Sequence, residues 1–589
     1  MPEASPIQTA SAISGDARPG ILGAWRCRAV ARSEPSAPLP ARVMESRGLS
    51  GPDAALFLEP SLKHLHDPSL LPGTDRAAER LLAAARGGER IVIYGDYDVD
   101  GVSASAILYH TIRAIAPGAS LGCYIPHRVD EGYGLSAQAI ADLAREGARV
   151  IVTVDCGISA REPARVARAA GVDLIITDHH APPEGDLPEA YAHVHPALPG
   201  REYPYPHLCG AAVAYKLAWR LCTMASGAER LPRALRELLL ELLALAALGI
   251  VADVVPLTGE HRVIARFGLG RIRGSPIHGL RALVESSGLA GDRVQADDVG
   301  FKLGPRLNAC GRLGHAGAAL ELLTTASPER GLEIARGLAR TNEERQRTER
   351  EVVEQAVASA HERGMTGPGR RAVVLADARW HTGVVGIACA RLVSMHHRPV
   401  ILLGRAGDLW SGSGRSVAGV HLAEALEACR GMLVSGGGHA MAAGLKLRPD
   451  SLPEFLEAFT EYVHARLPAD QMVRRIEYDV DATVDELSPE AVASLDRLAP
   501  FGQGNPRVHL RLRGVHVRGP TKPLGAEGKH LQTFLGSLDR SIRTVAWGWG
   551  ERARQIDRAV VDAVVVPKVS EWMGRRRVEL ELVDARPVA

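Results

Sequence analysis

The sequence has no large excess of charge of either sign. Its 589 residues include 70 Lys and Arg against 68 Asp and Glu, so the formal net charge is +2. This balance excludes a histone-like polycation and an acidic tail protein, and any affinity for nucleic acid must come from local basic patches. Aromatic residues are also scarce, at 4% of the chain, which limits the rings available for stacking against bases.

Paired cysteines and long apolar runs are absent as well. The eight cysteines stand singly, without a C-x-x-C pair, which argues against a zinc ribbon or a disulfide scaffold and favours reduced thiols in a cytoplasm. The most apolar run, residues 242–252, is too short to cross a bilayer. The N-terminal residues lack both the basic start and the apolar core of a secretion signal. We therefore expect a cytoplasmic protein with no membrane partner.

Strand-like and helix-like segments alternate in the first half of the chain. Residues 91–94, 149–154 and 173–177 are short apolar runs typical of strands, and residues 103–116 carry apolar side chains at helical spacing. Nearly continuous apolar strands separated by helices are typical of a parallel sheet covered on both faces. The predicted fold class is therefore α/β.

The rest of the chain divides by composition. A helical stretch rich in both charges is expected to connect two domains. A second strand and helix alternation begins at residue 371, and short β-like runs follow from about residue 506, which indicates a small antiparallel barrel of the oligonucleotide-binding (OB) type. The predicted domains are a disordered tail at 1–20, a first α/β domain with an N-terminal extension at 21–325, a connecting helix at 326–365, a second α/β domain at 366–470 and an OB-type domain at 471–589.

Acidic residues and histidines follow each of the three predicted strands. The motif GDYDVDG comes after the first, Asp155 after the second, and Asp178, His179 and His180 after the third. Because the carboxyl ends of parallel strands share one edge of the sheet, where ligands bind, we expect these side chains to converge.

Carboxylates gathered in this way repel one another unless protons or cations neutralise them. Oxygen ligands from Asp with imidazole from His suit Mn²⁺ or Mg²⁺, and the lack of thiolates here argues against structural zinc. A calcium loop of the EF-hand type would need Glu at position 107, where the chain has Ile107. A solvated acidic turn would explain the aspartates of GDYDVDG alone, but not the groups after the other two strands.

These motifs resemble a known superfamily. GDYDVDG, VTVDCG, TDHH and VADVVPL are similar to the four motifs of the DHH phosphoesterases. GPRLNACGRLG, WHTGVVGIACARL, SGSGRS, SGGGHAMAAG and PFGQGNP resemble one branch of that superfamily, the single-strand-specific 5′-to-3′ DNA exonucleases. The resemblance runs from about Trp25 to the C-terminus. It implies a parallel-sheet DHH domain, a second α/β domain of the DHH-associated type, and an OB-type barrel.

The resemblance also implies the residues of a centre with two ions. It assigns metal coordination to Asp96, Asp98, Asp100, Asp155, His179 and Asp253. It assigns catalytic roles to Asp98, Asp100, Asp155, His179 and His180. Asp155 would bridge the ions, His180 would lie against the scissile phosphate, and Asp178 would orient His179. His195 stands where Asn is common in the family, and its roles as a third ligand or as a hydrogen-bonded imidazole both stay open.

Other residues are expected to contact DNA or its phosphates. Local charge singles out Arg306 and Arg312, in a stretch with no acid, and residues 507–529, which carry a net charge of +5. The resemblance adds Arg128, which would grip a 5′-phosphate, and Arg415 and His439 of the second α/β domain. The same two motifs of that domain contain Ser416, Gly437 and Gly438, whose backbone could approach phosphates, with a purely structural turn as the alternative.

Taken together, these residues and the resemblance imply a Mn²⁺- or Mg²⁺-dependent exonuclease. It would degrade single-stranded DNA from 5′ to 3′ into 5′-mononucleotides, in DNA recombination and repair, with two ions in its centre. A monomer is expected, and a helicase and a single-strand-binding protein are candidate partners. The alternative is a DHH phosphodiesterase that acts on short oligonucleotides or cyclic dinucleotides, which would have no need of the C-terminal barrel.

Overall fold

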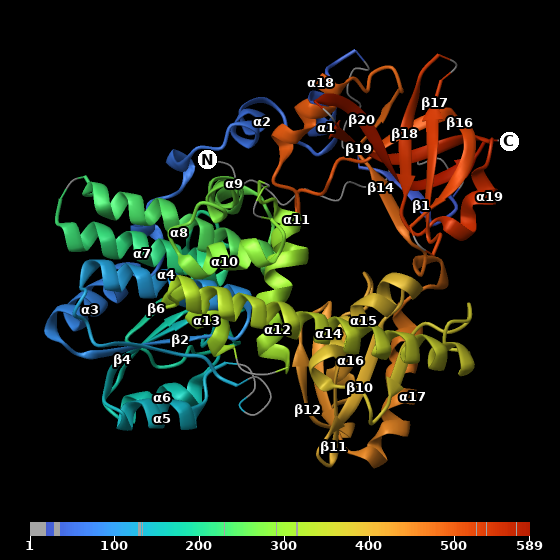
Figure 1. Cartoon of the computed structure of the whole chain (residues 1–589). Helices are drawn as coiled ribbons and strands as arrows, with labels where there is room; N and C mark the ends of the chain where they lie inside the picture. The colour runs from blue at the N-terminus through green and yellow to red at the C-terminus, as the bar shows by residue number, and fades with distance from the viewer. Residues whose placement is uncertain are drawn as a thin grey trace. The chain divides into compact units, whose positions relative to one another are not determined.

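The computed structural model describes residues 19–28, 36–127, 131, 134–228, 230–289, 291, 293–313, 316–525, 527–537, 539–572 and 574–588. The chain folds into two compact units (Figure 1). The first unit comprises Met1–Asn308, Ala316–Arg336 and Arg475–Ala589, and the second comprises Ala309–His315 and Gly337–Arg474. The first unit therefore holds both the predicted DHH sheet and the predicted barrel.

A five-stranded parallel sheet forms the centre of the DHH part. In spatial order its strands are β3 (Leu121–Tyr124), β2 (Arg90–Gly95), β4 (Ala148–Val154), β5 (Asp173–Thr177) and β6 (Ala192–Val194). The three strands expected from the sequence are its buried middle. The two edge strands were missed, because they are only four and three residues long and carry too few apolar side chains to stand out.

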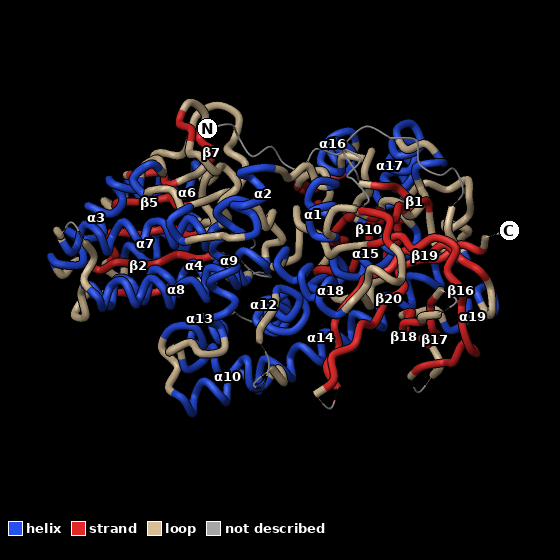
Figure 2. The backbone as a smooth tube through the Cα atoms, turned by 90° about the horizontal axis from the view of Figure 1, so that it is seen from above, coloured by secondary structure: helices blue, strands red, loops and turns tan. Residues whose placement is uncertain are grey.

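Helices cover both faces of this sheet (Figures 1 and 2). α5 (Ala137–Arg145) and α6 (Arg161–Ala169) bury their apolar faces against one side in a shared core. α4 (Val99–Ile115) lies on the other side and packs against α7 (Gly210–Ser226) and α8 (Arg233–Ala252). α3 (Thr74–Gly87) packs against α7 and β6. The predicted sheet with two covered faces is thereby confirmed.

More helices complete the DHH part and lead to the second unit. They are α9 (Gly259–Ile272), α10 (His278–Ser286), α11 (Ala296–Asp298), α12 (Gly304–Leu313) and α13 (Gly317–Thr324). The predicted connecting segment is one long helix, α14 (Pro328–Glu362). None of the helices in the described part of the chain combines the length and the apolar character needed to cross a membrane.

The second unit is a mixed sheet with helices. Its strands, in spatial order, are β12 (Leu433–Gly438), β13 (Ala442–Leu447), β11 (Leu409–Arg415), β10 (Val400–Ala406) and β9 (Val373–Ala376). Only β9 and β10 are parallel. The helices are α15 (Thr382–His396), α16 (Leu422–Ala428) and α17 (Leu452–Arg466). This unit confirms the second α/β fold, and its Gly-rich motif comprises the end of β12, the turn that follows and the start of β13.

The C-terminal strands close into a barrel. They are β16 (Leu510–Leu524), β17 (His530–Gly536), β18 (Ser541–Ala546), β20 (Arg575–Pro587) and β19 (Val560–Trp572), which pairs back with β16. Four of the five pairings are antiparallel, and β18 with β20 is parallel. Short β15 (Val480–Ala482) extends β16, and the helices α18 (Pro489–Leu495) and α19 (Ala553–Ile556) lie beside the barrel. The predicted OB-type barrel is confirmed.

The N-terminal segment belongs with this barrel in space. β1 (Ala24–Cys27) pairs with β14 (Arg475–Tyr478), and helices α1 (Leu39–Ser46) and α2 (Gly51–Leu58) place apolar side chains in the barrel core. Arg47 and Asp479 form a buried ion pair at 2.8 Å. From the sequence we expected this segment to extend the first domain, because no local pattern shows a partner that lies several hundred residues away in the chain.

Candidate metal centre

The GDYDVDG motif forms the turn from β2 into α4. Asp98 is the N-cap of α4, and its Oδ1 accepts a hydrogen bond from the Gly101 amide (3.0 Å). A Cβ at position 101 would lie 2.7 Å from the backbone of Asp96, so the tight turn requires glycine there. The turn therefore places Asp96, Asp98 and Asp100 at the carboxyl end of β2, as predicted.

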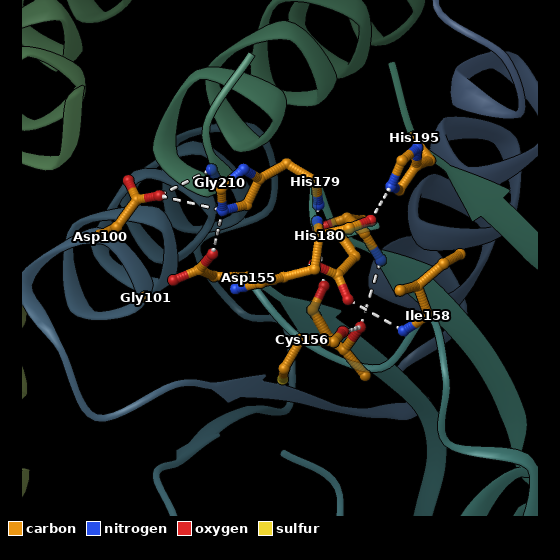
Figure 3. Close-up of polar contacts among 12 residues, drawn as sticks. Asp100, Gly101, Asp155, Cys156, Ile158, His179, His180, His195 and Gly210 are labelled. Atoms are coloured by element: carbon orange, nitrogen blue, oxygen red, sulfur yellow. Dashed lines mark hydrogen bonds and ion pairs between the residues drawn. The ribbon is translucent and has the colours of Figure 1, made fainter. Parts of the chain in front are cut away.

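Asp100 is held by the N-terminus of α7. Its Oδ2 accepts from the Gly210 amide (2.7 Å) and its Oδ1 accepts from the Ala211 amide (2.9 Å), as Figure 3 shows for this part of the site. Helix N-termini attract anions, and these amides are otherwise unpaired in the helix. Burial and the neighbouring charge of Asp98 nevertheless raise the pKa of Asp100 to about 6.

A buried histidine supports this amide cradle. Nε2 of His261 accepts from the Cys209 amide (3.1 Å), and Nδ1 donates to the Pro256 carbonyl (3.1 Å). The ring is fully buried, and burial lowers its pKa to about 3, so it is neutral. His261 thus links the start of α7, which holds Asp100, to the loop that follows Asp253. This residue was not predicted, since nothing in its local sequence pattern marks such a role.

Asp155 follows β4 in a left-handed backbone conformation, with φ of 63°. Its Oδ1 lies 3.1 Å from Nε2 of His179. The side chain is packed closely against α7, because a Cβ at Gly210 would lie only 2.6 Å from the same oxygen. Burial, and then the charge of Asp100, raise the pKa of Asp155 well above its usual range.

His179 faces several carboxylates at once. Its Nε2 lies 3.1 Å from Asp155, 3.7 Å from Asp253 and 4.0 Å from Asp100. The atom is buried, yet it forms no hydrogen bond of good geometry within the described part of the chain. Burial and the charge of His180 lower the pKa of His179 to about 3, so the ring is a neutral base at physiological pH. Burial and Asp100 raise the pKa of Asp253, which follows α8, to about 8.

Three overlapping groups of side chains can each hold one ion, with their ligand atoms within 4.8 Å of one another. They are Asp155, His179 and His180; Asp100, His179 and Asp253; and Asp96, Asp98 and Asp155. A divalent cation would neutralise the buried carboxylates, whose pKa values are raised, and would bind Nε2 of His179, which has no hydrogen-bond partner among the described residues. The donor set fits Mn²⁺ or Mg²⁺. The structure therefore brings together all six predicted ligands.

Asp178 contacts His180 more directly than His179. Its Oδ1 accepts from Nδ1 of His180 (2.8 Å) and from the backbone amide of His179 (2.7 Å), while Oδ2 accepts from the Ile158 amide (2.9 Å; Figure 3). Although burial opposes it, the hydrogen bond to His180 lowers the pKa of Asp178 to about 2. The same contact outweighs burial at His180 and raises its pKa to about 9. His180 is therefore a charged imidazolium at the edge of the site.

His195 is a hydrogen-bonded imidazole. Its Nδ1 accepts from the Ala197 amide (3.0 Å), and its Nε2 donates to the His180 carbonyl (2.8 Å). Both ring nitrogens are thereby used, and the residue is fully buried. It supports the backbone that carries His179 and His180, and it has no nitrogen left for an ion.

The expected phosphate-binding residues of the second unit differ in burial and in their hydrogen bonds. The Ser416 hydroxyl is buried and donates to the Val420 carbonyl (2.8 Å), so it stabilises its own loop. Gly437, Gly438 and His439 are exposed. Gly438 has φ of 151°, and a Cβ there would lie 2.4 Å from the Ala442 carbonyl oxygen; this glycine is required by the turn itself. Nη1 of Arg415, at the end of β11, donates to the Gly414 carbonyl (2.8 Å).

The remaining residues that were expected to contact DNA differ in the partners that their side chains have in the structure. Arg306 donates to the Lys302 carbonyl (2.8 Å), and Arg312 to the Gly383 carbonyl (3.4 Å). Arg128 lies outside the described residues. The basic run 507–529 forms several ion pairs, which are Arg507 with Asp297, Arg511 and Arg513 with the shared Asp481, and Lys529 with Glu527. Glu527 is already included in the net charge of +5, so the two carboxylates from outside the run, Asp297 and Asp481, compensate only part of the positive charge that the sequence predicts.

Comparison with known proteins places this fold and site in a family. Three family models match the chain: "DHH family, N-terminal domain" over residues 90–250, "DHHA1 domain" over 369–465 and "RecJ OB domain" over 478–584. The single-stranded-DNA-specific exonuclease RecJ of Dickeya dadantii is 35% identical over 96% of this chain and 100% of its own length. The chain belongs to the RecJ family.

Further RecJ proteins agree in sequence and in structure. RecJ of Escherichia coli is 36% identical over 94% of this chain and 96% of its own length. A crystal structure of RecJ from Thermus thermophilus with Mn²⁺ has a TM-score of 0.79 and 31% identity, and covers 96% of this chain and 80% of the other. A second structure of that RecJ, with Mg²⁺, has a TM-score of 0.74 and 30% identity over 96% and 79% of the chains. The expected DHH, DHH-associated and OB domains are confirmed by these matches.

Proposed function

We propose that this protein is a metal-dependent exonuclease that degrades single-stranded DNA. The observation that carries the proposal is the convergence of five aspartates and His179 at one edge of the parallel sheet, with a buried Nε2 that lacks a hydrogen-bond partner in the described structure. Membership of the RecJ family, whose curated members are single-stranded-DNA-specific exonucleases, supports the substrate. The 5′-to-3′ direction and the 5′-mononucleotide products rest on the resemblance of the motifs.

Each residue of the centre has a role that its surroundings support. Asp155 belongs to the ligand group of Asp96 and Asp98, and its Oδ1 also lies 3.1 Å from Nε2 of His179, a member of the other group, which favours it as the bridging carboxylate. Asp96 and Asp98 would complete one ion site, and Asp100, His179 and Asp253 the other. Asp100 retains lone pairs for an ion although both its oxygens accept amides. When bound, Mn²⁺ or Mg²⁺ at these sites would bind the phosphodiester and lower the pKa of a water nucleophile.

His180 would act on the phosphate as a hydrogen-bond donor. Asp178 holds its Nδ1 and keeps the ring charged at neutral pH, since the pKa is raised to about 9. The side chain is 34% exposed, so the imidazolium can reach a substrate oxygen. A fixed positive charge at this position stabilises the negative charge that develops on the phosphate in the transition state.

Several finer features extend the same proposal. Single-stranded DNA is the substrate, Arg128 would grip its 5′-phosphate, and Arg306, Arg312, Arg415 and His439 would hold the backbone. We propose a cytoplasmic monomer that works in recombination and repair beside a helicase and a single-strand-binding protein. The alternative of a phosphodiesterase for short oligonucleotides or cyclic dinucleotides is not favoured, because RecJ relatives match nearly the whole chain, including the barrel.

Digestion of end-labelled strands tests the proposal. Single strands labelled at the 5′ or the 3′ end are incubated with the protein, with and without Mn²⁺, beside duplex of the same sequence. We expect Mn²⁺-dependent release of the 5′ label first, with the duplex resistant. Asp155→Asn should abolish release yet retain binding of the strand in Ca²⁺, whereas exposed Asp408→Asn should behave as wild type. Release without a divalent ion, or full activity of Asp155→Asn, would contradict the metal centre.

A further inference from the structure

Helix α9 carries several arginines, and the first of them, Arg262, is buried with hydrogen-bond partners for its guanidinium. Arg262 is buried, with Nε donating to the Phe57 carbonyl (2.8 Å) and Nη1 to the Leu498 carbonyl (2.9 Å). Its guanidinium also lies 3.6 Å from the centre of the Phe57 ring. Because a guanidinium has five N–H donors and no acceptor, covering it requires carbonyl or carboxylate partners of this kind.

One turn further along α9, Arg266 has no such partners among the described residues. Arg266 is half-buried and lines a cavity of about 360 Å³ together with Arg271 and Arg293. Neither Arg266 nor Arg293 has a hydrogen bond or an ion pair from its side chain within the described part of the chain. Within the part of the chain that the structure describes, Arg271 donates only to the Phe267 carbonyl of its own helix (3.2 Å). The donors of these three guanidiniums are therefore available to a molecule in the cavity.

The charge around the cavity is strongly unbalanced. Glu59 is the one carboxylate among its described lining residues, and it is 3.5 Å from Arg497. Among the described residues, the three arginines therefore have no compensating acid. Burial is the main cause that lowers the pKa of Arg266, and the like charge of Arg293 lowers it further. An anion in the cavity would relieve this repulsion.

The apolar part of the lining points to the kind of anion. The half-buried aromatic side chain of Phe267 lines the cavity together with Leu58 and Pro60. Arginines combined with an aromatic ring are what proteins use to hold single-stranded nucleic acid, with the charge on the phosphate and the ring against sugar or base. A cavity of this volume is within the range of sites for small ligands, which matches a single nucleotide unit.

We propose that this cavity is a nucleotide-binding subsite that holds one phosphate and its nucleoside from a single strand of DNA, outside the metal centre. The proposal rests on the proposed function, since it presumes that single-stranded DNA is the substrate. The subsite would hold a strand that is already engaged and would add nothing to the hydrolysis of a substrate too short to reach it.

Charge removal at the subsite tests the idea. Arg266→Ala/Arg293→Ala is compared with wild type in binding a long fluorescent oligodeoxythymidine in Ca²⁺, at a series of salt concentrations. Each phosphate contact contributes about 0.7 to the slope of log affinity against log salt for single strands. Because the subsite holds one phosphate, we expect the slope to become shallower by about 0.7 and the affinity at low salt to fall roughly tenfold. Arg266→Lys/Arg293→Lys should keep most of the slope.

The controls separate a local subsite from a general effect of lost positive charge. Arg230→Ala/Arg236→Ala removes the same charge from a second arginine-lined cavity and should leave the slope unchanged; an equal loss there would overturn the proposal. An unchanged slope in Arg266→Ala/Arg293→Ala would overturn it too. The proposal would also be overturned if this variant lost binding to polyglutamate but bound DNA as wild type does, because the cavity would then be a site for acidic peptides. Mn²⁺-dependent hydrolysis of a trinucleotide should persist in the variant. If wild type hydrolyses no strand at all, the proposed function fails instead.

Discussion

Replacement of Gly210 by Ala tests how tightly the metal centre is packed. Gly210 is the first residue of α7, its amide donates to Asp100, and it lies against Asp155. An added Cβ would lie 2.6 Å from both Cβ and Oδ1 of Asp155. Ordinary contacts between carbon atoms are about 3.5–4.0 Å, so the Asp155 side chain would have to move by about 1 Å. The new methyl group would thus displace a proposed metal ligand without removing any ligand atom.

The expected effects on function and on stability differ in size. Ligand distances in a metal site tolerate about 0.2 Å, and misplacement by about 1 Å costs roughly 10²-fold in rate. We therefore expect at least a 10²-fold loss of Mn²⁺-dependent hydrolysis and weaker Mn²⁺ binding. Stability should fall by no more than about 2 kcal/mol, because Ala favours a helix over Gly by about 1 kcal/mol, and this offsets part of the about 1–3 kcal/mol that overpacking costs.

Three measurements on the variant check this reasoning. Titration calorimetry with Mn²⁺ reports the ion affinity, digestion of labelled single strands reports the rate, and thermal melting without metal reports stability. Gly337→Ala is the matched control, since it lies inside α14 with its nearest neighbouring atom 4.0 Å away; it should retain activity. Wild-type Mn²⁺ affinity and rate in Gly210→Ala would refute the proposed close packing of Asp155 against α7.

Other predictions concern charge and support. Between pH 6.5 and 8 the metal-free protein should lose stability as pH rises, because the raised pKa of Asp253, about 8, lets the folded state keep a proton that the unfolded state has released; melting curves should show a weaker dependence in Asp253→Asn, and an identical one would contradict the shift. His261→Phe leaves the Cys209 amide without its acceptor, and an unsatisfied buried donor costs about 1–3 kcal/mol. Calorimetry should therefore show weaker Mn²⁺ binding in His261→Phe than in His261→Gln, which keeps an acceptor. Equal Mn²⁺ binding in the two variants would argue against a positioning role for His261. Asp479→Ala should lower the free energy of unfolding by about 3–5 kcal/mol in urea, because buried Arg47 loses its carboxylate partner and is left with the neutral Asn505 side chain, and a change below about 1 kcal/mol would show that the pair is not needed.

The sequence predicted those parts of the fold that depend on near neighbours in the chain. The middle strands of the DHH sheet are continuous apolar runs, and each ends at an acidic motif, so both the sheet and the convergence of Asp98, Asp155 and His179 could be expected. The closed barrel followed from repeated short β-like runs. Edge strand β6, with three residues, carries too short a pattern to be found in this way.

Tertiary structure alone decided which distant segments meet. Four contacts join residues at least 30 positions apart in the chain. They are the pairing of β1 with β14, the hydrogen bonds from the α7 amides to Asp100, the hydrogen bond from the Cys209 amide to His261, and the ion pair of Arg511 with Asp481. Periodicity reports which face of an element is buried, because that depends on the element's own side chains. It cannot report what covers that face, because the partner is chosen by the complementarity of whole packed surfaces.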